Sequence, residues 1–150
     1  MTEVFFTEKQ KFTQWWLWVV LIITLIILPI NNTNKFNEYY LVTGVIILCV
    51  FYTMNLKIRI TSEGIYYQFF PFHFKEKFIA KKEVIDFEAI TYKPIIDYGG
   101  WGIRYGFKGK AYNVKGNRGI YISHINGKKI LFGTQKDIDF IIGLKRLRDN

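Results

Sequence analysis

Cysteine, proline and histidine are all scarce in this chain of 150 residues, which has one cysteine, three prolines and two histidines. A lone cysteine cannot form an intramolecular disulfide, and it leaves no paired thiolates to hold a metal ion. Two scattered histidines and no clustered carboxylates do not make a metal site either. The sequence therefore predicts no metal, no cofactor and no enzyme activity. An intracellular, reducing location fits this composition.

Charge is missing from two long stretches near the N-terminus. Residues 12–30 and 39–56 contain no Asp, Glu, Lys, Arg or His. Each is close to the roughly 20 residues that cross a hydrocarbon core about 30 Å thick. The polar segment 31–38 between them is too short to be a domain. These features predict two transmembrane α-helices, with spans at about 12–30 and 39–56, joined as a hairpin.

A cleaved signal peptide is the alternative to the first of these helices. Against it, the apolar run keeps bulky residues up to Leu28-Pro29-Ile30 and shows no small-residue cleavage pattern, and the second run would still remain. Neither run contains an ionisable side chain, which is the usual mark of an ion or proton path in a membrane. The hairpin is therefore interpreted as an anchor rather than a transport path.

The basic surplus of the chain lies after the hairpin. The formal net charge is +9, and the three lysines of residues 1–56 are balanced by three glutamates. Basic residues near membrane spans are retained on the cytoplasmic side. We therefore expect a multi-pass protein of the inner (plasma) membrane with both termini in the cytoplasm. Residues 1–56 would be a leader and hairpin, and residues 57–150 one cytoplasmic domain.

Residues 57–150 alternate between apolar and polar side chains, which is typical of half-buried strands. Asn126-Gly127 between two apolar runs is a strong hairpin signal. The predicted strands are residues 57–61, 65–70, 72–78, 84–92, 103–107, 111–115, 119–125 and 128–132. Residues 94–102 are rich in glycine and are predicted to be irregular, with backbone dihedrals that other residues avoid.

A period of 3.6 returns at the C-terminus. Thr134 is a predicted N-cap, and Phe140, Ile141, Leu144 and Leu147 form an apolar stripe at helical spacing. Taken together, these patterns predict an α+β domain. Its antiparallel β-barrel or sandwich of about seven strands is capped by one C-terminal α-helix.

Two short motifs suggest chemistry but have a better structural explanation. Gly100, Gly102 and Gly106 approach a phosphate-binding glycine loop, but the spacing is wrong by one residue and no helix follows. Ser123 and His124 are adjacent in a predicted strand, so their side chains point to opposite faces and cannot act as nucleophile and base.

Four segments carry a resemblance to a known family. Residues 60–66, 98–104, 111–122 and 127–135 resemble the bacterial pleckstrin-homology-like (PH-like) domains found in small integral membrane proteins of unknown function. The resemblance covers roughly residues 57–148 and rests on turn glycines and strand patterns. It implies a PH-like fold, and no catalytic residues are among its motifs.

Basic side chains are the candidate binding residues. They form two groups in the sequence, one near residues 75–82 and one in the predicted hairpins that follow residue 103. The candidates for contact with lipid or a partner are Lys75, Lys77, Lys81, Lys82, Arg104, Lys108, Lys110, Lys115 and Arg118. The structural alternative is that these residues only keep the domain soluble and mark its topology.

Phosphoinositide-binding PH domains place basic residues along their first two strands. Here the first strand has Lys57 and Arg59, but the loop carries Glu63 and the second strand has no basic residue. Specific inositol-phosphate binding is therefore not predicted.

The predicted function is that of a membrane-anchored, non-catalytic module for protein interaction or assembly, which accepts a partner on an edge strand or beside the C-terminal helix. Binding or sensing of anionic lipid through the basic face is the alternative, and a small membrane enzyme is a third. The partners expected are the lipid bilayer, anionic phospholipid headgroups, a membrane or cytoplasmic protein, or further copies of the chain. Nucleic acid is not expected.

Overall fold

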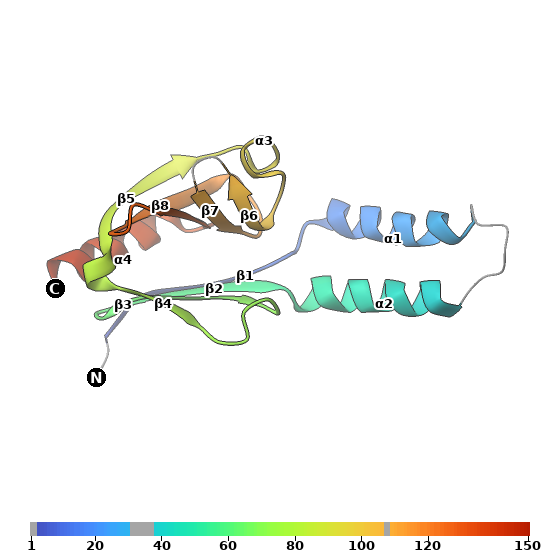
Figure 1. The fold of residues 1–150 in the computed structure, drawn as a ribbon, viewed down its shortest axis with the longest axis horizontal. Helices are drawn as coiled ribbons and strands as arrows, with labels where there is room; N and C mark the ends of the chain where they lie inside the picture. Colours follow the sequence, from blue (N-terminus) through green and yellow to red (C-terminus); the bar gives the residue numbers. More distant parts are fainter. Residues whose placement is uncertain (1–2, 31–37, 107–108) are drawn as a thin grey trace.

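Figure 1 shows an elongated molecule in which two helices project side by side from a body of strands. This computed structural model describes residues 3–30, 38–106 and 109–150. Within these residues the chain has an α+β fold with two β-sheets and four α-helices. The first three helices are α1 (Trp15–Ile30), α2 (Glu38–Thr53) and the short α3 (Pro94–Tyr98).

The first sheet has four antiparallel strands in the order β1-β2-β3-β4. They are β1 (Val4–Lys11), β2 (Asn55–Thr61), β3 (Gly64–Phe70) and β4 (Lys77–Ala80). Alternation in β2 buries Leu56, Ile58 and Ile60 completely, as the period of two predicts. A single turn of 3-10 helix, η1 (Lys81–Glu83), leads from β4 to the second sheet.

The second sheet has five strands in the order β5-β8-β9-β7-β6. They are β5 (Val84–Thr91), β6 (Gly102–Gly106), β7 (Gly109–Asn113), β8 (Arg118–His124) and β9 (Lys129–Gly133). The predicted Asn126-Gly127 hairpin is confirmed: β8 and β9 pair antiparallel around it, and Gly127 has a φ of 77°. In contrast, β7 and β9 are parallel.

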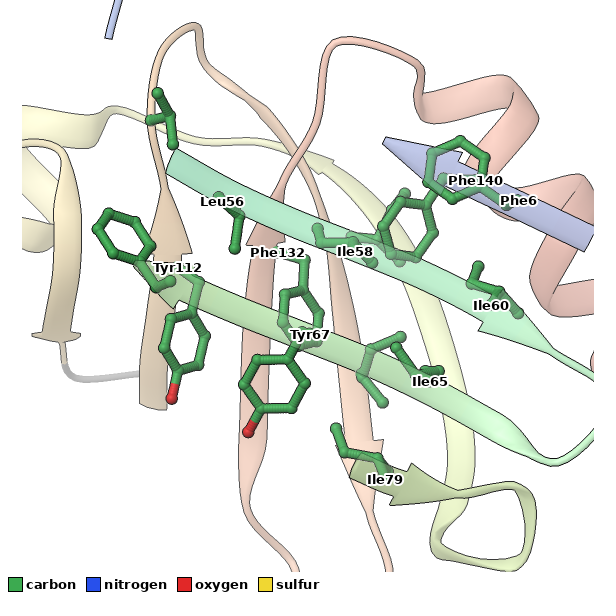
Figure 2. Close-up of a cluster of buried hydrophobic side chains, with 14 of the residues drawn as sticks. Phe6, Leu56, Ile58, Ile60, Ile65, Tyr67, Ile79, Tyr112, Phe132 and Phe140 are labelled. Atoms are coloured by element: carbon green, nitrogen blue, oxygen red, sulfur yellow. The ribbon is translucent and has the colours of Figure 1, made fainter. Parts of the chain in front are cut away.

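The two sheets share one hydrophobic core, which the C-terminal helix closes at one side (Figures 1 and 2). Helix α4 (Asp137–Asp149) contacts β1 and β2 of the first sheet and β5 and β8 of the second. Its predicted apolar stripe is confirmed, since Phe140, Leu144 and Leu147 are buried. The contact is close, because a Cβ added at Gly143 would lie 2.9 Å from Cβ of Phe6.

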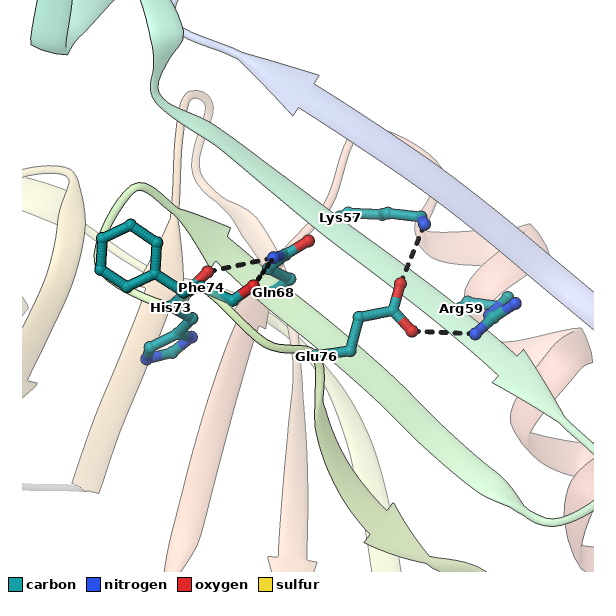
Figure 3. A network of polar contacts seen from close by, with 6 residues as sticks. All are labelled: Lys57, Arg59, Gln68, His73, Phe74 and Glu76. Carbon is teal, nitrogen blue, oxygen red and sulfur yellow. Dashed lines mark hydrogen bonds and ion pairs between the residues drawn. The ribbon is translucent and has the colours of Figure 1, made fainter.

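The predicted barrel is wrong. The nine strands in the described part of the chain form two separate hydrogen-bonded sheets and no closed barrel, and the parallel β7–β9 pair departs from the antiparallel prediction. The predicted strand at residues 72–78 is also mostly wrong, because only Lys77 and Phe78 enter β4. The side-chain amide of Gln68 donates to the carbonyls of His73 and Phe74, at 3.0 and 3.1 Å, and holds this segment as a turn (Figure 3).

Strand β1 lies in the segment that we assigned to the leader. Its inward residues are Phe6, Glu8 and Gln10, all buried, and it pairs with β2 along almost its whole length. Two of these three residues are polar, so the strand shows no alternation of hydrophobicity. Hydrogen bonds instead hold these polar side chains: Glu8 accepts from the Thr134 hydroxyl at 2.6 Å, and Gln10 Nε2 donates to the carbonyl of Gly133 at 2.7 Å, while the side-chain oxygen of Gln10 is buried without a partner.

The prediction of two membrane spans is also wrong. Helices α1 and α2 have 16 residues each, which is about 24 Å at 1.5 Å per residue and shorter than a hydrocarbon core of about 30 Å. Among the described residues, no helix has both the length and the apolar character needed to cross a membrane. The transmembrane hairpin and the multi-pass inner-membrane location with cytoplasmic termini are therefore not supported.

The apolar runs in the sequence are longer than the helices, because the residues at their ends pack into the β-body, which consists of the two β-sheets and helix α4. Phe12 is 5% exposed in the core, and the side-chain amide of Gln14 donates to the carbonyl of Val114 at 2.7 Å. At the other end, Met54 and Leu56 are buried with the strands. The helical hairpin itself is present: a Cβ at Gly44 of α2 would lie 3.1 Å from Cδ2 of Leu25 in α1. The predicted polar turn lies outside the described residues, except for Glu38.

Two further predictions about loops can be compared with the structure. The irregular segment predicted at residues 94–102 is wrong in its first half, because residues 94–98 form the short helix α3. The unusual backbone predicted there is confirmed at Gly99, Gly100 and Gly102, which have φ values of 70°, 123° and 116°. The N-cap of α4 is Lys136 and not Thr134. The Thr134 hydroxyl is buried, where it donates to Glu8 and accepts from the backbone N–H of Lys136.

Candidate functional site

The nine candidate basic residues do not form one continuous face. Lys81 and Lys82 line a groove beside α4, while Lys77 and Lys110 lie near a group of tyrosines. Three others make contacts elsewhere: Arg104 Nε donates to the carbonyl of Trp101, Lys115 Nζ to Oγ1 of Thr13, and Arg118 pairs with Asp137 at 3.1 Å. Lys75 is exposed, and Lys108 lies outside the described residues.

The groove beside α4 is a cavity of about 180 Å³ between the helix and the η1–β5 segment. Apolar side chains line most of it: Val84, Ile85, Phe87, Leu144 and Leu147. Three cationic side chains complete the lining: Lys81, Lys82 and Arg148. The groove therefore combines an apolar surface with a concentration of positive charge.

Arg148 is held at this groove by an aromatic ring. Its guanidinium carbon lies 5.4 Å from the ring centroid of Phe87, which is a cation–π distance. The carboxylate of Asp149 is 3.8 Å from Nε of Arg148, but both side chains are well exposed, so water screens this pair strongly. The sequence pattern selected Lys81 and Lys82 for this region but missed Arg148, which is close to them only in the folded chain.

The strand that borders the groove is an edge strand. β5 pairs with β8 on one side and is the last strand of its sheet. An edge strand presents unpaired backbone N–H and C=O groups to whatever lies beside it. At the start of β5, Glu83 is already engaged, since its carboxylate accepts the backbone N–H of Ala80 at 2.8 Å.

A second group of cations surrounds exposed and buried tyrosines. The ammonium of Lys110 lies 4.9 Å from the ring centroid of Tyr105 and 5.0 Å from that of Tyr112. Lys110, and with it Lys77 and Lys128, lowers the pKa of Tyr105 below its usual value. Burial, together with Lys77 and Lys110, also lowers the pKa of His73. The sequence analysis did not identify Lys128, Tyr105 or Tyr112.

The basic residues of β2 are neutralised by a loop. Glu76 accepts from Lys57 Nζ through one oxygen and from an Arg59 NH2 group through the other, each at 2.9 Å (Figure 3). The hydrogen bond from Lys57 and the two positive charges lower the pKa of Glu76. Lys57 and Arg59 therefore share one carboxylate.

Ser123 and His124 have the arrangement expected of a structural pair. His124 Nδ1 accepts the backbone N–H of Asn126 at 3.2 Å within the β8–β9 turn, and its Nε2 lies 3.8 Å from Glu83. Within residues 3–30, 38–106 and 109–150, no three His, Cys, Asp or Glu side chains gather as a metal-binding group.

The helical hairpin exposes apolar side chains on several sides of both helices. They include Val19, Val20, Ile22, Ile23, Ile26 and Ile27 of α1 and Val42, Val45, Ile46 and Val50 of α2. At the base of the hairpin, Trp16 packs on Trp101 of the β-body with ring centroids 5.5 Å apart. Exposed apolar patches of this extent mark contact surfaces.

Comparison with known proteins adds no assignment to this geometry. No family model, no curated protein and no solved structure matches the chain. The resemblance to bacterial PH-like domains stays a prediction from the sequence.

Proposed function

We propose that this chain is a non-catalytic module for protein interaction and assembly. The observation that supports this proposal best is the groove between β5 and α4, which has an apolar lining, three cationic side chains and an edge strand beside it. These are the features by which a sheet edge accepts an extended peptide: the backbone supplies affinity, and pockets for alternate side chains supply specificity.

The lining of the groove indicates the chemistry of the peptide. Ile85 is 63% exposed on β5 and lines the cavity with Leu144 and Leu147 of α4, so a bulky apolar side chain of the peptide would cover it. Lys81, Lys82 and Arg148 line the same cavity, so they favour acidic side chains on the peptide face that carries this residue. Side chains on one face of an extended strand are two positions apart. The proposed partner is therefore an extended segment with an apolar residue and acidic residues two positions to either side of it.

A binding measurement tests this proposal. A fluorescein-labelled peptide with a leucine and aspartates two positions to either side of it is titrated with the full chain, and anisotropy is recorded. We expect saturable binding that weakens with salt, because charged contacts contribute to it. The double variant Lys82→Glu/Arg148→Glu is expected to weaken binding at least about tenfold, which is about 1.4 kcal/mol. Amides of β5 should exchange more slowly with deuterium when the peptide is bound.

Lys145→Glu is the matched control. It makes the same charge reversal at an exposed position of α4 that does not line the groove, and binding should be nearly unchanged. Equal binding of a peptide with lysines in place of the aspartates, or full binding by the groove variant, would contradict the proposal.

We also propose that the helical hairpin assembles copies of this chain. No charged residue occurs between Trp15 and Ile30 or between Tyr39 and Thr53, so contact between two hairpins buries no charge. A hairpin about 24 Å long and about 20 Å wide presents roughly 500 Å² on each broad face. One such face falls short of the roughly 800 Å² per partner of a standard interface, but a chain that uses both faces buries more than that. Because both faces are apolar, association is expected to continue beyond a dimer.

The single cysteine, exposed Cys49 of α2, reports on this assembly. We expect light scattering in aqueous buffer to give a mass above that of the monomer, and a short bismaleimide to crosslink Cys49 between chains. The double variant Ile23→Asn/Val45→Asn should reduce both signals, whereas Ile138→Asn, at an exposed position of α4, should not. A monomeric chain would overturn the proposal, as would uptake of monomers by neutral lipid vesicles, which would make lipid the occupant.

A further inference from the structure

Three lysines that are far apart in the sequence come together at one place on the β-body. Lys77 opens β4, Lys110 lies in β7, and Lys128 precedes β9. Lys77 is paired with Tyr67 across β3 and β4, the Tyr67 ring lies 5.1 Å from that of Tyr112, and the Lys110 ammonium lies 5.0 Å from the Tyr112 ring. All three lysines also lower the pKa of Tyr105, which is 75% exposed. In the part of the chain that the structure describes, none of the three forms an ion pair with a carboxylate.

Lys110 is positioned by two aromatic rings. Its ammonium lies 4.9 Å from the Tyr105 centroid and 5.0 Å from the Tyr112 centroid, so cation–π contacts hold it on both sides. A long surface side chain normally loses rotamer entropy when it binds a ligand. Part of that entropy loss occurs before a ligand binds, because the two rings already restrict the Lys110 side chain.

Two buried tyrosines and a histidine lie next to these lysines. Tyr67 and Tyr112 are almost completely buried, with ring centroids 5.1 Å apart, and Figure 2 shows both hydroxyls pointing to the same side. His73 lies beside them, 5.5 Å from Tyr112 between centroids. Its Nδ1 accepts the backbone N–H of Phe69, so the proton of the neutral ring is on Nε2.

The electrostatics of this place are positive, and no acid among the described residues contributes to the shift of either titrating group here. Burial, together with Lys77 and Lys110, lowers the pKa of His73, and Lys110, with Lys77 and Lys128, lowers the pKa of Tyr105, so two titrating groups respond to the same cations. Glu76 lies close in sequence, but its carboxylate is occupied by Lys57 and Arg59. Such a site attracts an anion with several acceptor oxygens.

We propose that Lys77 and Lys110 bind the phosphate group of a phosphate monoester beside the exposed ring of Tyr105, with Lys128 at the rim. The lysines neutralise the dianion. This site is separate from the groove beside α4, because the two share no lining residue. Its ligand is either a soluble phosphate monoester or the phosphomonoester headgroup of a lipid such as phosphatidic acid, which share this chemistry.

Phenyl phosphate is the probe for a soluble ligand. It is titrated into the full chain by calorimetry at low salt, with an expected Kd of about 1 mM or tighter, which is about −4 kcal/mol. Lys110→Gln and Lys77→Gln should each weaken binding about tenfold, and Lys110→Arg should restore most of it. Lys145→Gln, which removes an exposed lysine of α4, should change it less than about twofold.

The ring resonances of Tyr105, assigned with Tyr105→Phe, give a second readout that a purely structural role would not affect. A bound dianion offsets the nearby lysines, so the pKa of Tyr105 should rise when phenyl phosphate is added. The charged groups to consider are Lys77, Lys110 and Lys128, together with His73. The circular dichroism of each variant shows whether it is folded.

Vesicles separate the two sources of phosphate. Sedimentation with vesicles that contain phosphatidic acid, and not with vesicles of phosphatidylcholine alone, that is lost in Lys110→Gln would identify a lipid headgroup as the source. Binding of phenyl phosphate alone would identify a soluble ligand. The proposal is overturned if neither binds, or if the folded Lys77→Gln/Lys110→Gln variant binds as the natural chain does.

Discussion

Replacing Glu8 by alanine is expected to lower the free energy of unfolding by about 2–4 kcal/mol, because the substitution leaves two buried donors without an acceptor. Glu8 is 6% exposed in β1. Its Oε2 accepts the hydroxyl of Thr134 at 2.6 Å, and its Oε1 accepts the backbone N–H of Gln135 at 2.9 Å. These bonds connect the first strand to the segment that leads into α4.

Urea denaturation of Glu8→Ala measures this effect, and Lys9→Ala is the matched control. Lys9 is the next residue of the same strand, but its side chain is exposed, so its substitution should cost less than about 0.5 kcal/mol. A double-mutant cycle with Thr134→Val should give a coupling energy of about 1 kcal/mol or more, since the two side chains are in contact. Equal stability of Glu8→Ala and Lys9→Ala would show that β1 is not held by these bonds.

Phe132→Ala is expected to cost about 3–5 kcal/mol, the range for removing a fully buried aromatic ring from a core. The Phe132 ring has no exposed surface and lies between the two sheets and α4 (Figure 2). Its centroid is 5.0 Å from that of Tyr67 in the first sheet, 5.7 Å from that of Tyr112 in the second, and 6.5 Å from that of Phe140 in α4. The cavity left by alanine would therefore weaken all three layers at once.

The matched control for this substitution is Phe74→Ala, which removes the same ring from a position that is 82% exposed. Its unfolding free energy should change by less than about 1 kcal/mol, because little apolar surface is buried there. Thermal denaturation should separate the two variants clearly. A Phe132→Ala chain as stable as Phe74→Ala would mean that the core does not depend on this ring.

The elements predicted correctly are those whose signal is local. β2 and β3 alternate strictly, Asn126-Gly127 supplies the turn between β8 and β9, and the C-terminal stripe has helical spacing. In each case, neighbouring residues alone decide which backbone conformation buries the apolar side chains. The helical hairpin was predicted for the same reason, although its membrane spans were not correct.

The incorrect predictions come from residues whose partners lie far along the chain. Phe12 and Met54 looked like parts of apolar helices, but the β-body buries them. β1 was missed because its inward residues Glu8 and Gln10 are polar and form hydrogen bonds with residues more than a hundred positions away. A pattern of hydrophobicity cannot reveal a polar side chain that becomes buried only when its distant partner is in place.

The candidate sites show the same division. The sequence indicated a basic surplus, a groove beside the C-terminal helix and several lysines, since these follow from composition and order. It did not indicate that Arg148 joins Lys81 and Lys82, or that Lys77, Lys110 and Lys128 surround Tyr105.

By itself, the sequence determined most of the strands, the C-terminal helix and the apolar hairpin, because hydrogen bonds and side-chain burial within each element depend on residues close in the chain. Only the tertiary structure decided the two-sheet arrangement, the parallel contact of β7 with β9 and the grouping of the cations. The physical reason is that each of these depends on contacts between distant segments, whose free energy is gained only after the chain has closed the loops between them.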